Sequence, residues 1–179
     1  MLTAMRNPVR VTIALDDESV KIFEELKKEL GLSQSEIIRR VIKFYRDYKF
    51  LEKFDREKVS TYIEMLGEGE HVVLDIDHWI SLLEFIESHP SGEDFWKLHR
   101  EIAKAHAEEF SGKDLEYVLR RLEACNFFRL QVKKNEFVLL LNHEKTKKFV
   151  KMLMEVLLEK MGFECEIRED LMKLRITKA

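Results

Sequence analysis

The first fifty residues show a change in the period of their apolar positions. Residues 10–15 read Arg-Val-Thr-Ile-Ala-Leu, in which β-branched and apolar residues alternate with polar or small ones. This period of two predicts a half-buried strand. Between Asp16 and Gly31, and again from Ser33 to Tyr45, apolar residues recur three or four positions apart. That spacing is typical of amphipathic helices, so the pattern predicts a strand, a helix, a turn and a second helix.

Local polar residues predict where the two helices begin and end. Asp16 precedes an acidic first turn and suits the N-cap position, whereas Gly31 suits the left-handed position that ends a helix. Ser33 and Glu36 have the spacing of a capping box. In a capping box the serine hydroxyl and the glutamate carboxylate each accept a backbone N–H from the other residue. We therefore expect a reciprocal cap at the start of the second helix.

The chain after the second helix is expected to divide into a linker and a second domain. Residues 49–69 have a helical composition and predict a helical linker, and residues 70–179 predict a separate folded domain. That domain opens with an apolar run at residues 71–76, which predicts a buried strand. Three helices follow, and Pro90 and the pair Ser111–Gly112 separate them.

The last third of the chain predicts two hairpins on either side of one helix. Strand-like runs at residues 127–132 and 137–141 form the first hairpin, and runs at residues 163–168 and 172–177 form the second. A long amphipathic helix lies between them, and Gly162 ends it. The expected fold class is therefore α+β, with β-hairpins that flank a long helix.

Composition excludes several classes of protein. Of the 179 residues 45% are hydrophobic, with six Gly and two Pro, which allows a sizeable core and excludes a disordered or fibrous chain. No apolar run reaches the ~18–20 residues of a membrane span, and the N-terminus lacks the pattern of a secretory signal. Cys125 and Cys165 are too isolated for a disulfide framework or a zinc site. We therefore expect a cytoplasmic protein without a membrane partner or a cofactor.

The net charge of −3 hides a difference along the chain. Residues 1–50 hold ten Lys or Arg and eight Asp or Glu, a balance of +2, whereas residues 51–179 hold 21 and 26, a balance of −5. The net charge of the whole chain argues weakly against a nucleic-acid partner, but the slightly basic head is compatible with one. Charged residues make up 36%, with Glu and Lys dominant, and this composition resembles that of proteins from thermophiles.

Two stretches read Arg-Val-Thr-Ile-Ala-Leu-Asp-Asp-Glu, from residue 10, and Gly-Leu-Ser-Gln-Ser-Glu-Ile-Ile, from residue 31. Together they resemble the ribbon-helix-helix family of DNA-binding proteins, the MetJ/Arc/CopG superfamily. The resemblance covers roughly residues 8–47, so we expect a ribbon-helix-helix DNA-binding domain over residues 1–48. It implies an intertwined homodimer that binds double-stranded DNA as a sequence-specific transcriptional regulator. A dimer of dimers on tandem half-sites would also fit the family.

Physical chemistry explains why this pattern suits DNA. A single strand has two unpaired edges, so we expect it to pair with its copy in a second subunit as an antiparallel ribbon. The inner face of that ribbon would carry Val11, Ile13 and Leu15. By the resemblance, the residues that face the bases are Arg10, Thr12 and Ala14. A β-ribbon fits the major groove, where Arg reads guanine and Thr or Ala contacts a thymine methyl.

The start of the second helix is the expected clamp on the DNA backbone. Its first turn carries free backbone N–H groups, and a helix N-terminus favours phosphate. The family holds the DNA backbone at this place, so the resemblance assigns phosphate contacts to Ser33, Gln34 and Ser35. Arg6 in the flanking arm is a further phosphate candidate.

Each of these features also has a plain structural interpretation. A strand of this pattern is often only the exposed face of an edge strand, and a capping box is often only the start of a helix. Ala14 also departs from the hydroxyl or longer side chains that are often found at the third position. The combination of the strand, the two helices and the turn in one order still favours sequence-specific DNA binding.

Metal binding and catalysis are the weaker alternatives. Nickel-responsive relatives of the family carry a metal-sensing domain, but their histidine–cysteine pattern is not recognisable here, so no metal site is predicted. The residues that could be considered are His71, Asp75, Asp77, His78, His99 and His106. A Ser-His-Asp spacing, a P-loop and a dinucleotide-binding fingerprint are all missing from the sequence. We therefore expect no enzyme and no catalytic residues.

The role of the C-terminal domain is open between several interpretations. Its hairpin–helix–hairpin order resembles, in topology only, the small-molecule-sensing domains related to 4-vinyl reductase, and Cys165 does not match their cysteine motif. Large apolar residues can line a pocket for an effector or simply form a core. They are Trp79, Phe95, Trp96, Phe127, Phe128, Met152, Met154 and Met161. We expect a regulator with a ligand-sensing or oligomerisation domain; the alternative is an antitoxin whose C-terminal region binds a toxin protein.

Overall fold

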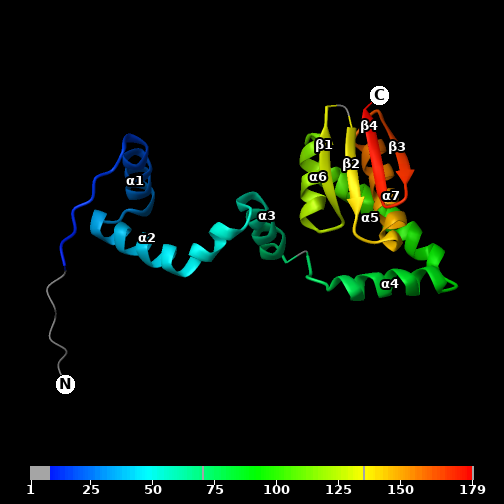
Figure 1. Cartoon of the computed structure of the whole chain (residues 1–179), viewed down its shortest axis with the longest axis horizontal. Coiled ribbons are helices and arrows are strands. Elements are labelled where there is room, and N and C mark those ends of the chain that lie inside the picture. The colour runs from blue at the N-terminus through cyan, green and yellow to red at the C-terminus, as the bar shows by residue number, and fades with distance from the viewer. Residues whose placement is uncertain (1–8, 70, 135, 179) are drawn as a thin grey trace, which may run out of the picture. The chain divides into compact units, whose positions relative to one another are not determined.

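The computed structural model describes residues 9–69, 71–134 and 136–178 (Figure 1). The chain divides into two compact units, one that ends at Asp55 and one that begins at Arg56. We call them the N-terminal unit and the C-terminal unit. Together they confirm the α+β fold class, with helices throughout and one antiparallel sheet.

The N-terminal unit consists of an extended segment and two helices. Helix α1 spans Asp17–Leu30 and helix α2 spans Gln34–Tyr48, and the 3-10 helix η1, Lys49–Lys53, follows. Both predicted helices are therefore confirmed. Residues 9–16 are neither helix nor strand. A strand is defined by its hydrogen bonds to a neighbouring strand, so the predicted ribbon needs a second copy of the chain and stays a prediction.

The predicted helix ends are formed, with one difference. The Asp16 carboxylate accepts the backbone N–H of Ser19 at 2.7 Å, and Gly31 ends α1 at φ 62°. The Ser33 hydroxyl accepts the N–H of Glu36 at 3.3 Å. The Glu36 carboxylate, however, accepts from the Arg39 guanidinium at 2.6 Å, so the reciprocal half of the predicted capping box is wrong. A charge-assisted pair is stronger than a bond to a neutral amide, which explains the preference of Glu36 for Arg39.

The N-terminal unit has almost no core of its own. Among its described residues only Ile37, at 1% exposure, is a buried hydrophobic residue. Many large apolar side chains of this unit stay exposed to solvent. They include Val11, Ile13, Leu15, Val20, Ile22, Val41, Ile42 and Phe44. Burial of apolar surface is the main stabilising term in folding, so one copy of this unit lacks the core that it needs.

The C-terminal unit contains five helices and four strands among its described residues. The helices are α3 (Arg56–Gly67), α4 (Ile76–Ser88), α5 (Gly92–Glu109), α6 (Leu115–Ala124) and α7 (Lys147–Lys160), with the 3-10 helix η2 (Glu144–Thr146) before α7. The strands are β1 (Phe128–Lys133), β2 (Glu136–Leu141), β3 (Cys165–Asp170) and β4 (Lys173–Lys178). The predicted hairpins on either side of a long helix are confirmed.

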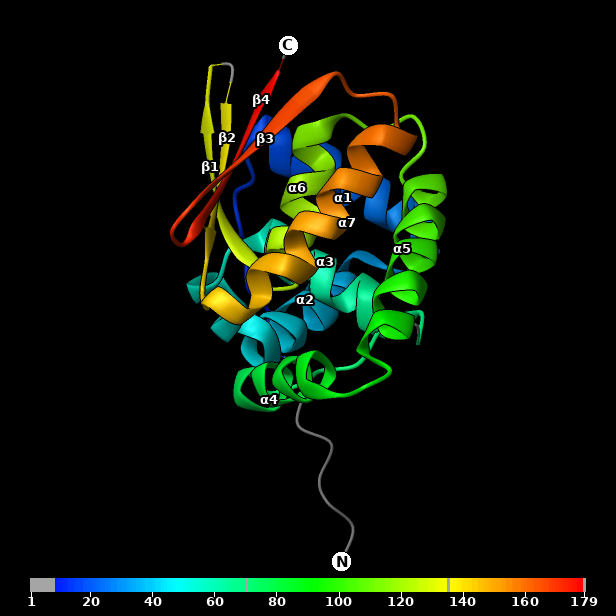
Figure 2. The ribbon, with the colours of Figure 1, turned by 90° about the vertical axis from the view of Figure 1, so that its right-hand side faces the viewer.

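The two hairpins join into one antiparallel sheet of order β1-β2-β4-β3 (Figure 1). Phe137 of β2 is opposite Ile176 of β4, which also pairs with Ile167 of β3. Helices α6 and α7 cover one face of the sheet, and α5 packs on α7 (Figure 2). Leu139, Leu174 and Ile176 are fully buried in the core beneath these helices. This layer arrangement leaves α5, α6 and α7 close enough to share a hollow, described below.

The strand predicted at residues 71–76 is wrong. Residues 71–75 are neither helix nor strand, and Ile76 is already the first residue of α4. The Asp75 carboxylate caps α4 by accepting the N–H of Asp77 at 2.9 Å. Val72 and Val73 are 89% and 83% exposed. An apolar run becomes a buried strand only where a neighbouring strand pairs with it, and no described strand does so here.

Candidate nucleic-acid interface and the C-terminal hollow

The residues predicted to face DNA bases lie on an accessible segment. Arg10, Thr12 and Ala14 are all exposed, and Arg10 has no ion pair or hydrogen bond within the described chain. The alternating residues are exposed as well: Val11 is 78%, Ile13 54% and Leu15 42% exposed. The segment therefore carries one polar row and one apolar row, and neither row is covered within the N-terminal unit.

The predicted phosphate contacts lie at the first turn of α2. Ser33, Gln34 and Ser35 are exposed, and the Ser33 hydroxyl is already engaged as the cap of α2. A first turn leaves backbone N–H groups without helical partners, so these groups can donate to an anion. Arg6, the remaining predicted contact, lies outside the described residues.

The negative charge of one acidic side chain near this turn is offset by two arginines of α2. Glu36 would repel a phosphate, but its carboxylate lies 2.6 Å from Arg39 and 3.9 Å from Arg40. The hydrogen bond and the positive charge of Arg39 lower the pKa of the Glu36 carboxyl, so it stays ionised and paired. Lys43 and Arg46 continue the basic residues along α2. The sequence pattern did not identify this compensation, because it assigned Glu36 to the cap.

The residues considered for a metal have other contacts. Asp75 caps α4, and the ring Nδ1 of His78 lies 3.9 Å from its carboxylate. His71 Nδ1 lies 3.1 Å from the Met65 carbonyl oxygen. His106 pairs with Glu109 at 3.1 Å. Within the described part of the chain, no three His, Cys, Asp or Glu side chains are grouped to hold a metal ion.

A hollow of about 500 Å³ lies in the C-terminal unit among α3, α5, α6 and α7. Its apolar wall is formed chiefly by Ile102, Phe110, Leu122, Phe127, Phe149 and Leu153. Its polar residues include three histidines, the Arg121–Glu64 ion pair, Glu109 in contact with His106, and the thiol of Cys125. His99 is the one of these that is buried, at 4% exposure.

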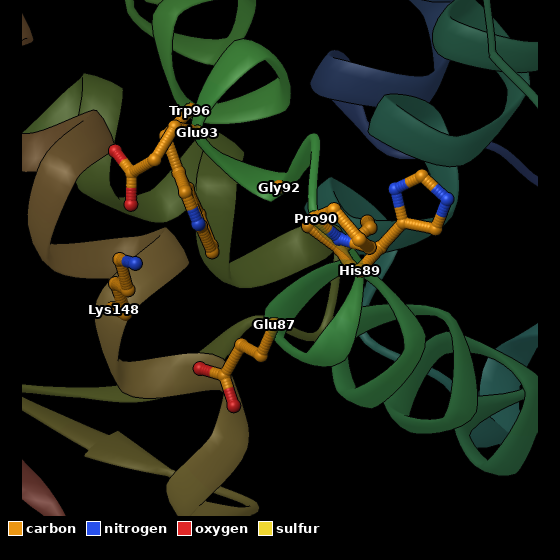
Figure 3. A pocket seen from close by; sticks show the side chains of 8 residues that line it. Glu87, His89, Pro90, Gly92, Glu93, Trp96 and Lys148 are labelled. Atoms are coloured by element: carbon orange, nitrogen blue, oxygen red, sulfur yellow. The ribbon is translucent and has the colours of Figure 1, made fainter.

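A smaller hollow of about 310 Å³ lies beside the turn between α4 and α5 (Figure 3). The Lys148 ammonium lies 4.2 Å from the centre of the Trp96 ring. Glu87 of α4 lines the same hollow. Gly92 is the first residue of α5, where the chain passes close to the Ile86 carbonyl. This hollow is polar and shallow, with the Lys148–Trp96 contact as its main feature.

The large apolar residues considered for a pocket are mostly core residues. Phe128, Met152 and Met154 are buried, and Met161 packs against the main core. Trp79 and Phe95 pack against a second cluster that contains Trp96. Phe127 lines the larger hollow and Trp96 the smaller one. The remaining lining residues of the larger hollow come from positions that sequence patterns did not connect, because they are up to 89 residues apart along the chain, from Glu64 to Leu153.

Comparison with known proteins gives one match, in the N-terminal unit. Residues 9–49 match the family model of the ribbon-helix-helix protein, copG family. Proteins of this family bind DNA, dimerise and are not enzymes. No curated protein and no solved structure matches the chain. Among the described residues, no helix has the length and apolar character needed to cross a membrane.

Proposed function

We propose that the chain, whose residues 9–49 belong to the copG ribbon-helix-helix family, is a sequence-specific transcriptional regulator. In this proposal residues 1–48 bind DNA as a dimer, and residues 70–179 form a sensing or oligomerisation domain. Residues 49–69 are the helical linker between these two domains. The observation that carries the proposal is the segment before α1, which exposes an apolar row and a polar row in alternation.

The apolar row supports a dimer. Val11, Ile13 and Leu15 are large side chains that water solvates poorly, and α2 exposes Val41 and Ile42 as well. Burial of such side chains is worth about 1.5–3 kcal/mol each. Two copies of residues 10–15 can pair as antiparallel strands and lay this row on the four helices of the dimer. Pairing also satisfies the backbone N–H and C=O groups that a lone strand leaves open.

The polar row then meets the major groove. A two-stranded ribbon fits that groove, and it would present Arg10, Thr12 and Ala14 twice, related by the two-fold axis of the dimer. The Arg10 guanidinium can donate to O6 and N7 of a guanine. Thr12 and Ala14 can contact thymine methyl groups. Base contacts of these three side chains would give the protein its sequence preference.

The start of α2 sets the position of the ribbon. The N–H groups near Gln34 and Ser35 donate to one phosphate on each side of the ribbon, and this contact is the same for every sequence. Arg6 adds a second backbone contact in this proposal. The basic residues of α2 favour the approach to DNA, although the charge of the whole chain is −3.

The folded C-terminal unit supports a regulator rather than an antitoxin. An antitoxin of this family binds its toxin through a short segment that is commonly unfolded before binding. Here the C-terminal unit has a four-stranded sheet and its own core beneath α6 and α7. We therefore place the antitoxin second. A gene for a small toxin next to the gene of this protein would reverse that order.

Substitution of Arg10 tests the proposal. Selection from a random duplex library supplies a preferred sequence for the wild-type protein. Arg10→Ala should lose at least about tenfold of the preference for that sequence over a scrambled duplex, because the dimer loses two Arg–guanine pairs and each discriminates by about 1–3 kcal/mol. The matched control is Lys21→Ala, which removes an exposed charge from α1 and should weaken both duplexes equally. An unchanged preference in Arg10→Ala contradicts the proposal.

A further inference from the structure

The larger hollow of the C-terminal unit has the size of a small-molecule site. Its volume of about 500 Å³ lies within the range of roughly 300–1,000 Å³ that is common for ligand pockets. Helices α3, α5, α6 and α7 supply most of its wall, and the segments that follow α3, α5 and α6 complete it with Glu68, His71, Phe110, Lys113, Cys125 and Phe127. All of its lining residues belong to the C-terminal unit.

The wall of the hollow is suited to a flat aromatic molecule. Phe127 and Phe149 lie with ring centres 5.5 Å apart, and His99 stacks on Phe149 at 4.0 Å. Ring faces and edges at such spacings attract a further aromatic ring by stacking or edge contact. Ile102 lies at the rim and is 46% exposed, so part of the apolar wall is open to solvent.

Counted without histidine, the charged side chains of the hollow are three carboxylates and two cations. Arg121 donates to Glu64 at 3.0 Å, and His106 lies 3.1 Å from Glu109. The Lys113 ammonium lies 5.1 Å from the centre of the Tyr117 ring, and Glu68 contributes one charge of the opposite sign. An anionic ligand would have to leave water without a surplus of positive charge to receive it. The site therefore disfavours a negatively charged molecule.

His99 supplies a hydrogen-bond acceptor. Its Nε2 lies 3.1 Å from the Phe149 carbonyl oxygen, and a carbonyl only accepts, so Nε2 is the atom that carries the proton. Burial lowers the pKa of the His99 ring, which keeps the ring neutral. Nδ1 is then the acceptor of the ring, and it is not among the buried polar atoms that lack a partner, so it is not sealed inside the core. A ligand with an O–H or N–H group can donate to it.

We propose that this hollow binds one aromatic molecule that has no negative charge and carries a hydrogen-bond donor for His99. The aromatic wall holds the ring, and the donor group meets Nδ1 of His99. The site is independent of the proposed DNA interface, which lies in the N-terminal unit, so either proposal can fail without the other.

Three related probes test the ligand class by equilibrium dialysis of the full chain. 1-Naphthol has the ring and the donor, naphthalene lacks the donor, and 1-naphthoate carries a negative charge. We expect one 1-naphthol to bind per chain, about tenfold more tightly than naphthalene or 1-naphthoate, because an unmade buried hydrogen bond or a desolvated charge costs at least that much. In His99→Phe the preference for 1-naphthol over naphthalene should disappear.

Two exposed positions on α5 test the location. Ile102→Trp places a larger ring at the rim of the hollow and should weaken 1-naphthol binding at least about tenfold by occupying the site. Leu98→Trp is the matched control, since Leu98 is exposed on the same helix but does not line the hollow; its binding should equal that of the wild type.

The two cysteines give a second readout that does not depend on a variant. Cys125 lines the hollow, and Cys165 does not. Bound 1-naphthol should slow the alkylation of Cys125, measured by peptide mass spectrometry, and leave that of Cys165 unchanged. The site is refuted if 1-naphthol does not bind, or if Ile102→Trp retains full affinity while Cys125 stays unprotected. Equal affinity for naphthalene or for 1-naphthoate refutes the ligand class.

Discussion

At the scale of single residues, His99 shows how tertiary packing sets the chemistry of a side chain. It is buried on α5 beside Phe95 and Phe149, and its hydrogen bond to the Phe149 carbonyl crosses to α7. Desolvation is the main cause that lowers the pKa of its ring below the usual 6.5. His99 therefore stays neutral in the fold at a pH where it would take up a proton in the unfolded chain.

This difference predicts that acid destabilises the C-terminal unit. Below a pH of about 6.5 the unfolded chain binds a proton that the folded His99 does not, so the free energy of unfolding falls as the pH decreases further. Urea unfolding between pH 7.5 and 5.5 measures the effect. His99→Gln should flatten this pH dependence, since glutamine can donate to Phe149 but does not titrate. The control His78→Gln removes an exposed histidine and should leave the dependence unchanged; equal slopes for both variants contradict the explanation.

Sequence patterns predicted the candidate DNA contacts as one set, whereas they marked Phe127 and three histidines of the hollow without bringing them together. Arg10, Thr12 and Ala14 follow from alternation over six positions, a signal that is complete within the segment itself. The environment of His99 depends on a carbonyl fifty residues away. No local pattern contains that distance, so the sequence alone marked His99 only as one of several residues to consider for a metal.

At the scale of elements, the turn between α4 and α5 depends on Gly92. A Cβ atom at this position would overlap the backbone carbonyl of Ile86, and a backbone atom cannot rotate away as a side chain can. Gly92→Ala should lower the free energy of unfolding of the C-terminal unit by about 1–3 kcal/mol.

Thermal and urea unfolding measure this loss. Gly67→Ala is the matched control, because a Cβ at Gly67 meets open space at the end of α3. That variant should be as stable as the wild type or slightly more stable, since Ala has the higher helix propensity. If Gly92→Ala is as stable as Gly67→Ala, the turn does not need glycine.

Elements with complete local signals were predicted well. Caps, period and a terminal glycine lie within the helices that they mark, as at Asp16 and Gly31 for α1. The run at residues 71–76 has the same apolar character as a true strand, yet the neighbours that decide between strand and loop lie elsewhere in the chain. Glu36 shows the same limit. Whether its carboxylate accepts from the Ser33 N–H or from the Arg39 guanidinium depends on which hydrogen bond is stronger.

At the scale of the whole molecule, the two units have different requirements for stability. The C-terminal unit buries its own core, whereas the N-terminal unit exposes most of its apolar side chains. We expect the full chain to be a dimer that is held together through residues 10–15 and the helices α1 and α2.

Ile13→Glu tests this division. A charge on the apolar row should make the chain monomeric in sedimentation experiments and abolish DNA binding, because a buried carboxylate without a partner costs several kcal/mol. The sheet of the C-terminal unit should remain folded by circular dichroism. Thr12→Ala alters the neighbouring outward position and should leave the dimer intact. A dimer in Ile13→Glu would show that another surface holds the two copies together.

The central claim is that a ribbon of residues 10–15 reads bases in the major groove. Dimethyl sulfate methylates guanine N7, which faces that groove, so protection of the selected duplex from methylation measures the claim most directly. We predict that the wild-type dimer protects at least one guanine in each half-site, and that saturating Arg10→Ala leaves those guanines reactive. Guanines that stay reactive under the wild-type protein, or that Arg10→Ala protects equally, contradict the account.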